Sequence, residues 1–271
     1  MIATLDQLIA ALANNSEPAV INKASIATQA AGGFSSLWRA TGTPAQGAIP
    51  GAAAICTKSL LGALKGFASA GGGESVYLGR LFLLSGNSAT SVQLHDRLAH
   101  MGGLSGTVTT AQTVGVDVTS LIGSRCAADC QAVQWWIEQY TAIGTTAVSA
   151  TVTYTDALGN AGKTVSVSIG GASPLNQPSR MFPIPAPADG IAIKSIQTIQ
   201  HATTGTAGSY GITATRSLGG LSLGLANSGV VADWAGLGLP QVPNDACIFP
   251  IMICGTTSTG VLYGNAELIT G

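Results

Sequence analysis

The first 32 residues place apolar side chains at helical spacing. Four residues at i, i+3, i+4 and i+7 form one stripe on a helix face: Leu5, Leu8, Ile9 and Leu12. Thr4, with Gln7 three residues later, has the spacing of a capping box and predicts the helix start. We expect a second helix from Ser16, with Pro18 in its first turn, to Gly32.

Glycine and proline interrupt residues 33–73, which predicts an irregular, extended arm. Pro44 and Pro50 lie within it, and Trp38 is its one large apolar anchor. Because such a long irregular segment is unusual inside a compact domain, we expect the arm to lie across a partner. The predicted organisation is a helical region and arm over residues 1–73 and a β domain over residues 74–271.

From residue 74 the apolar pattern alternates with a period of two, which predicts β-strands. The expected strands are 76–84, 91–98, 133–140, 148–155, 164–169, 195–200, 210–216, 246–254 and 261–269. We expect successive strands to pair as hairpins, with a short helix around 121–132 crossing one end. The predicted fold is mainly β, an antiparallel β-sandwich or jelly roll.

The chain carries little charge. Only 8% of its 271 residues are charged and the net charge is −1, whereas about 25% is usual in soluble domains. No run of about 20 apolar residues predicts a membrane-spanning helix, and the scattered basic residues argue against nucleic acid as a partner. Strand positions that free β proteins protect with Lys carry Ser, Thr or Gln here. We therefore expect other subunits to cover part of the surface.

The cysteine pattern and the N-terminus indicate a protein made in a reducing cytosol. Residues 1–6 lack the basic region of a signal peptide. The five cysteines are scattered, unlike a secreted disulfide framework: Cys56, Cys126, Cys130, Cys247 and Cys254. We interpret them as small buried side chains, and a disulfide to a neighbouring subunit stays open.

Three motifs that suggest chemistry have simpler explanations. Residues 157–164 approach a phosphate-loop pattern ending in Gly-Lys-Thr, but an alternating strand follows, so we expect a hairpin turn. His95 and Asp96 are adjacent on a strand and would point to opposite faces. Ser222 lies in a Gly-x-Ser-x-Gly match with no later histidine, whereas a nucleophile elbow needs one. A hydrolase that uses Ser222, His95 or His201 is the least favoured alternative.

Metal binding and ligand stacking are not favoured either. Cys126 and Cys130 lack the second cysteine pair of a zinc site. For Trp135 and Trp136, adjacent on a strand, core and subunit interface are favoured over sugar stacking. We therefore expect no metal, no cofactor and no enzymatic activity.

Several stretches resemble virion structural proteins of tailed phages, such as head decoration, neck or tail components. These stretches are residues 33–42, 145–164, 199–208, 244–248 and 255–260. The resemblance implies a protein made in the host cytoplasm and located in the virion.

The favoured hypothesis is a capsid-associated or decoration protein. It would self-associate, most simply as a homotrimer, and dock on other virion proteins such as the major capsid protein. The alternative is a receptor- or glycan-binding module of a tail or fibre. The candidate interface residues are Leu5, Leu8, Ile9, Leu12, Trp38 and Trp136.

Overall fold

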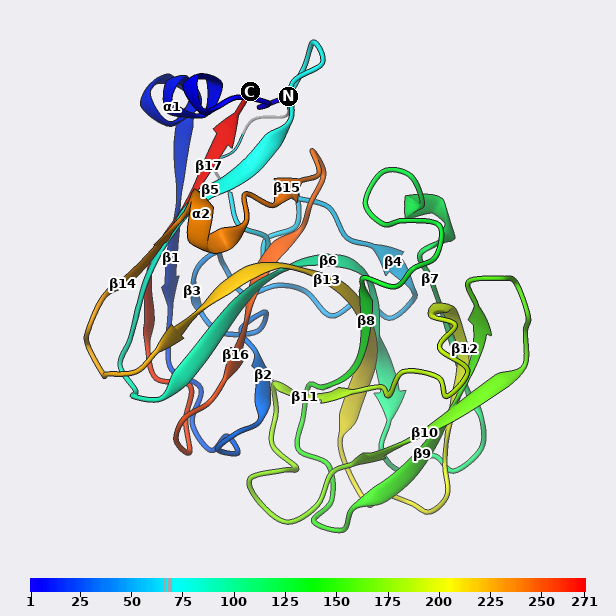
Figure 1. The fold of residues 1–271 in the computed structure, drawn as a ribbon. Coiled ribbons are helices and arrows are strands. Elements are labelled where there is room, and N and C mark those ends of the chain that lie inside the picture. Colours follow the sequence, from blue (N-terminus) through cyan, green and yellow to red (C-terminus); the bar gives the residue numbers. More distant parts are fainter. Residues whose placement is uncertain (66, 68–69) are drawn as a thin grey trace.

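The chain folds into antiparallel β-sheets with two short helices (Figure 1). A computed structural model describes residues 1–65, 67 and 70–271. The first nine elements are α1 (Leu5–Asn14), β1 (Ser16–Lys23), β2 (Phe34–Ser36), β3 (Gly42–Thr43), β4 (Ala54–Ile55), β5 (Val76–Ser85), β6 (Thr90–Ser105), β7 (Gln112–Asp117) and η1 (Thr119–Leu121). The remaining elements are β8 (Val133–Gln139), β9 (Val148–Asp156), β10 (Lys163–Ile169), β11 (Arg180–Pro183), β12 (Ile193–His201), β13 (Ser209–Leu223), β14 (Val230–Asp233), α2 (Trp234–Leu237), β15 (Gln241–Val242), β16 (Ile248–Ile253) and β17 (Leu262–Thr270).

One end of the molecule is a sandwich built on the sheet β14-β5-β17-β1-β3, with β15 added beside β5. The inward side chains of this sheet, such as Ile21, Leu81 and Leu83, share a core with Leu94 of β6 and Ile248 of β16. The other end is a second sandwich, in which the sheet β10-β9-β12-β7 packs on β6, β8 and β13. The predicted mainly β, sandwich or jelly-roll fold is thus confirmed.

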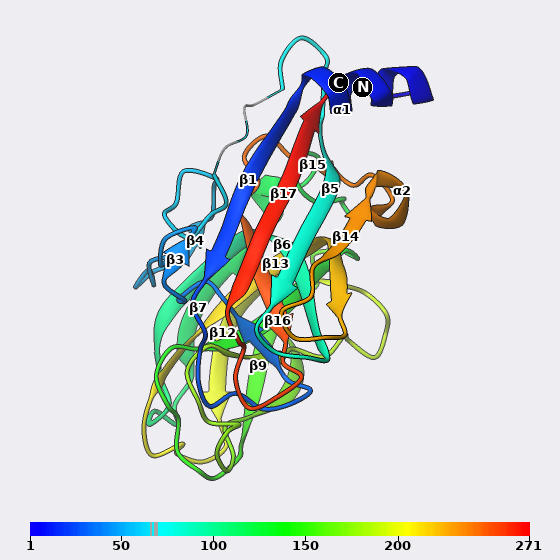
Figure 2. The ribbon, with the colours of Figure 1, turned by 90° about the vertical axis from the view of Figure 1, so that its left-hand side faces the viewer.

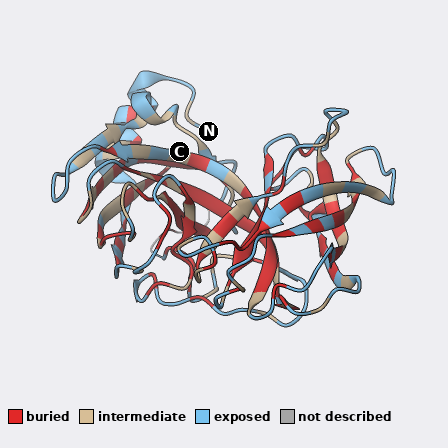
Figure 3. Cartoon of the chain, turned by 90° about the horizontal axis from the view of Figure 1, so that it is seen from below, coloured by how far each residue is buried: buried red, intermediate tan, exposed pale blue. Residues whose placement is uncertain are grey.

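The strands β6 and β13 run through both sandwiches and join them (Figure 1), and buried residues line the interior of both parts (Figure 3). They pair with each other along 13 matched positions, and three register shifts bend them. Their pairing also closes the strand order β13-β8-β11-β2-β16-β6 into a ring. The ring encloses a separate cluster that includes Trp38, Trp136 and Phe249.

The predicted second helix over 16–32 is wrong, because its first eight residues form the strand β1. Ala19 and Ile21 point into the core while Val20 between them is exposed, which is a period of two. β1 pairs with β17 at eight positions, so tertiary pairing decides the conformation of this segment. The short helix expected around 121–132 is also wrong: η1 ends at Leu121, and turns follow.

The described residues of the predicted arm over 33–73 are partly built into the protein's own sheets. Its strand β2 sits between β11 and β16, and β4 pairs with β6. Trp38 is fully buried. Residues 1–73 and 74–271, which were expected to form two regions, therefore share the same sheets.

Of the four expected hairpins, the one between 148–155 and 164–169 is confirmed as β9 and β10. The other three expected pairs, β5 with β6, β12 with β13 and β16 with β17, each divide between two sheets. Their turns connect one layer of a sandwich to the facing layer, so each strand finds its partners far away in the sequence.

Candidate assembly surface

The sheet β14-β5-β17-β1 turns its outer face to the viewer in Figure 2, and each of its four strands has apolar side chains on this face. Strand register places Val231, Phe82, Asn265 and Val20 in one row across the four strands. Leu84, Tyr263 and Asn22 form the next row. We call the apolar members of this surface the open face: Pro18, Val20, Phe82, Leu84, Val231 and Tyr263.

The open face is accessible, although its side chains are of the kind usually found in a core. Val20 is 57% exposed, Val231 58% and Tyr263 41%, while Phe82 and Leu84 are half-buried. Alternation forces this arrangement, because the residues between them, such as Ile21 and Leu83, already fill the inner core. The sheet is therefore apolar on both sides, and an open antiparallel sheet usually has one polar face.

Three charged residues lie beside the open face, one basic and two acidic. Arg80 of β5 forms an ion pair of 3.2 Å with Glu267 of β17. Asp233 of β14 stands opposite Arg80 on the other side. These three residues and Pro18 make one row, so charge is confined to one margin of the face.

Helix α1 covers the same side of the sheet at one end, near both termini (Figure 1). Its capping box is formed as expected, with Thr4 accepting from the backbone N–H of Gln7. Leu8 and Ala11 pack on Tyr77 of β5 and Ile269 of β17.

The predicted interface stripe on α1 is thus divided in two. Leu8 is buried and Leu12 packs beside it on the protein's own sheet. Leu5 and Ile9 remain 58% and 56% exposed. Only these two are placed to extend the open face around the end of the sheet.

The two predicted interface tryptophans lie inside the protein. Trp38 is fully buried, and its Nε1 donates to the carbonyl of Ala48 at 2.8 Å. Trp136 is 4% exposed, and its Nε1 donates to Oγ1 of Thr215 at 2.8 Å. Because both rings are enclosed and both N–H groups are satisfied, the interface role predicted for Trp38 and Trp136 is wrong in this conformation.

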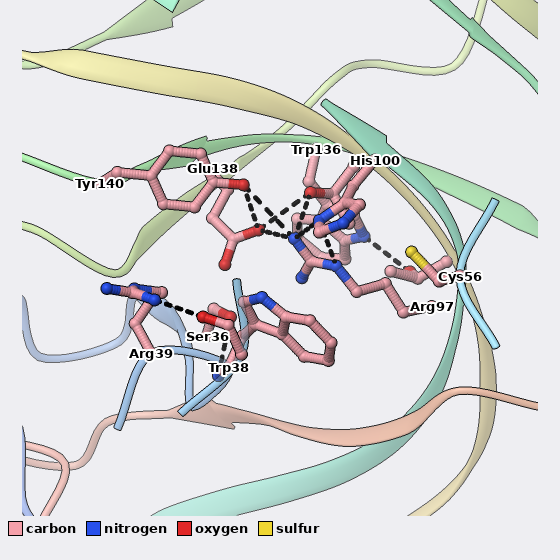
Figure 4. A network of polar contacts seen from close by, with 12 residues as sticks. Ser36, Trp38, Arg39, Cys56, Arg97, His100, Trp136, Glu138 and Tyr140 are labelled. Carbon is pink, nitrogen blue, oxygen red and sulfur yellow. Dashed lines mark hydrogen bonds and ion pairs between the residues drawn. The ribbon is translucent and has the colours of Figure 1, made fainter. Parts of the chain in front are cut away.

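The interior around Trp38 contains a charged network that the sequence analysis missed (Figure 4). Arg97 Nη2 lies 2.6 Å from Glu138 Oε2, and neither side chain is exposed. Arg97 Nε donates to Nδ1 of His100 at 3.0 Å, and the guanidinium lies 4.6 Å from the centre of the Trp38 ring. Thr213 donates to the same Glu138 oxygen at 2.9 Å. Burial acts to raise the pKa of Glu138, but the charge and hydrogen bond of Arg97 outweigh it and hold that pKa below its ordinary value.

A second buried ion pair lies next to the first. Arg125 Nε donates to Asp96 Oδ2 at 3.0 Å, and Asp96 Oδ1 accepts the backbone N–H of Cys247 at 2.8 Å. The pair ties the turn after η1 to β6 and to the segment before β16. One signal was available in the sequence: Asp96 and Arg97 are adjacent charges between Leu94 and Leu98 on a strand of a chain with few charges. Their partners could not be identified without the topology.

The residues of the hydrolase alternative are not brought together. His95 contacts Thr215 at 3.1 Å and Gln93 at 3.0 Å, on the other side of β6 from Asp96. Ser222 Oγ instead meets Ser91 Oγ at 3.2 Å. Burial lowers the pKa of His95 to about 4 and also lowers that of His201.

The Gly-Lys-Thr segment is the turn between β9 and β10, as expected. Asp156 accepts the backbone N–H of Asn160 at 2.9 Å, and Lys163 lies 2.6 Å from both Asp156 and Asp189. These two carboxylates raise the pKa of Lys163. Lys163 thus closes a turn at the start of a strand, where no helix follows to hold a phosphate.

Neither a metal-binding cluster nor a membrane-spanning helix is found in the described ranges. Residues 1–65, 67 and 70–271 contain no group of three or more His, Cys, Asp or Glu placed to hold a metal ion. No helix in the same ranges is long and apolar enough to cross a membrane. The five cysteines are free thiols, and all of them are buried.

Comparison with known proteins gives weak structural similarities. No protein-family model and no curated protein sequence matches the chain. A crystal structure of the infectious bursal disease virus VP2 subviral particle is similar with a TM-score of 0.21 and 11% identity, covering 94% of this chain and 79% of that one. The crystal structure of the T13 viral particle of the same virus has a TM-score of 0.16 and 12% identity, covering 94% and 76%. TM-scores of this size lie below those of proteins that share a whole fold.

Proposed function

We propose that this chain is a non-enzymatic structural protein of a virus particle that packs through its open face against neighbouring copies of itself. The finer proposal is a capsid-associated or decoration protein of a tailed-phage virion, which also docks on the major capsid protein. The resemblance of residues 33–42 and 145–164 to tailed-phage virion proteins supports this class. The open face is the observation that carries the proposal, because exposed apolar patches of this kind mark interaction sites.

The open face is large enough for a small contact between two subunits. Its outer rows, from that of Arg80 to that of Leu84, extend about six residues along four strands, which is roughly 400 Å² at about 3.4 Å per residue and 4.8 Å between strands. Two such faces together would bury roughly 800 Å², somewhat less than the roughly 1,000 Å² of a small specific interface. Leu5 and Ile9 at the end of the sheet would add to this area.

The chemistry of the open face favours a second copy as its occupant. Its centre is uncharged, and the charges at its margin are of mixed sign, with Arg80 between Glu267 and Asp233. Two copies can therefore meet without a field of like charges between them. Helix α1 already covers one end of this side of the sheet with Leu8 and Ala11, which shows that apolar side chains pack well on it.

Charge substitutions on the open face test the proposal. Val20→Lys and Val231→Lys each place an ammonium group in the centre of the proposed contact, at positions that are more than half exposed in the subunit. We expect each to weaken self-association at least tenfold in sedimentation experiments, without changing the unfolding midpoint of the subunit. Thr151→Lys, on the exposed side of β9, is the matched control and should associate like the wild type.

The outcome against the proposal is equally clear. A wild-type protein that stays monomeric at high micromolar concentration would contradict it, and so would Val20→Lys associating as well as Thr151→Lys. The same measurement counts the copies in the assembly: a two-fold contact through the open face gives a dimer, whereas the sequence-based prediction is a homotrimer. Copy number per particle separates a shell component, present in many copies, from the tail or fibre alternative, present in few. The buried rings of Trp135 and Trp136 offer that alternative no stacking platform.

A further inference from the structure

The strand β10 ends the sheet β10-β9-β12-β7, and its outer edge has features that favour strand addition. It has seven residues, and β9 is the strand that pairs with it along its whole length in the described part of the chain. In an antiparallel pair, every second residue of an outer strand directs its N–H and C=O away from its neighbour. β10 contains no proline and no charged residue after Lys163.

The other sheet edges of this protein carry the protection that β10 lacks. The edge strands β3, β4 and β15 have two residues each, and β14 has four. The edge of β1 has Pro18, which has no N–H to donate, next to the charged Glu17. β7 contains Gly115 at φ +70°, and its pairing with β12 is shifted. Natural sheets block edge-to-edge contact with short strands, prolines, charges and bulges of this kind.

We propose that β10 pairs antiparallel with β10 of a second copy and joins two four-stranded sheets into one continuous sheet. The inference builds on the self-association proposed above, and it assigns a second contact surface on the opposite sandwich from the open face (Figure 1). A two-fold contact through the open face alone would stop at a dimer. A second, independent contact allows the assembly to continue.

The sequence of β10 is complementary to itself in one register. Pairing all seven residues requires that Ser166, at the centre of the strand, face Ser166 of the second copy. Val165 then faces Val167 of the second copy, on the inner side. Thr164 faces Ser168 on the outer side. Apolar residues meet apolar residues and hydroxyls meet hydroxyls at the five central positions, while Lys163 faces Ile169 at each end, so no like charges are opposed.

Single cysteines provide a test of both the contact and its register. In the full-length protein, Ser166→Cys would stand directly opposite its own copy and should form a disulfide-linked dimer under mild oxidation. Thr164→Cys is the control, because the two copies of that position lie roughly 13 Å apart along the strands, beyond the reach of about 7 Å for a disulfide. A mixture of Thr164→Cys and Ser168→Cys proteins should cross-link where neither does alone. The five native thiols are buried and should not compete.

Two results would overturn the pairing. In the first, Ser166→Cys cross-links no faster than Thr164→Cys while Val20→Lys still weakens association, so the proposed function stands and the β10 contact fails. In the second, the wild type and all cysteine variants stay monomeric, and both proposals fail together. Ser166→Lys adds an independent readout, because it opposes two like charges and should weaken association at least tenfold. The double variant Thr164→Lys/Ser168→Glu opposes unlike charges and should retain association.

Discussion

Replacing Glu138 by Gln tests how strongly the buried network around Arg97 holds the interior together. The substitution keeps the shape of the side chain and removes its charge, so the Arg97 guanidinium stays buried without a counter-ion. Two unit charges about 4 Å apart attract by about 4 kcal/mol at an effective dielectric constant of about 20. Breaking a buried pair costs about 3–5 kcal/mol. We expect the free energy of unfolding to fall by about this amount, because neither Arg97 nor Glu138 is exposed.

Equilibrium unfolding in urea, followed by tryptophan fluorescence, measures this loss. Trp38 is a suitable reporter because its ring is fully buried and lies 4.6 Å from the Arg97 guanidinium. Asp189→Asn is the control, because it removes one carboxylate from an exposed ion pair with Lys163. It should leave the midpoint unchanged. The double variant Arg97→Met/Glu138→Gln removes both charges and should lose less than the sum of the single losses.

Arg97 does not depend on the charge of Glu138 if Glu138→Gln unfolds at the same urea concentration as Asp189→Asn. That result would mean that Arg97 finds enough compensation in its other contacts. His100 at 3.0 Å and Thr213 at 3.1 Å are the candidates for this compensation.

Three further predictions follow from buried and half-buried groups. Burial lowers the pKa of His95 to about 4, and burial together with Arg97 lowers that of His100 to about 2. Both imidazoles are therefore neutral in the folded protein, and their full contribution to its stability is present above about pH 6.5, the pKa of histidine in an unfolded chain. Below that pH the unfolded chain takes up protons that the folded protein does not, so the urea midpoint should fall as the pH drops towards about 4. Leu8→Ala should cost about 2 kcal/mol or more because Leu8 is buried against the sheet. Leu5→Ala should change the thermal midpoint little because Leu5 is 58% exposed. Isothermal titration should show no ATP binding, and Lys163→Ala should behave like the wild type in that assay, since Lys163 closes a turn.

The sequence predicted secondary structure correctly where neighbouring residues alone determine it. The capping box at Thr4 and the β9–β10 hairpin are both local devices, and both formed as expected. The segment 16–23 shows the opposite case. Its Ser-x-Pro start resembles a helix beginning, but its conformation depends on β17, which no local signal identifies.

The sequence predicted that an uncharged surface would exist, but it did not show which strands form that surface. Few charges and few protected strands indicated a surface covered by partners, and the open face is the surface that we propose for this role. Its members come from β1, β5, β14 and β17, so only the register brings Val20, Phe82 and Val231 into one row. Trp38 was expected outside because its segment is rich in glycine. Those glycines instead let the chain approach the ring, since a Cβ on Gly47 would lie 2.0 Å from it.

The central position of β17 has a consequence for how new subunits mature. β1 and β5 do not pair with each other, and each pairs with β17 between them. A ribosome that adds about 5–20 residues per second makes β17 roughly 12–50 s after β1. Until then the growing chain has no open face to offer. Subunits still attached to neighbouring ribosomes on one message therefore cannot yet meet through this face, and a product cut short before β17 cannot enter an assembly built on it.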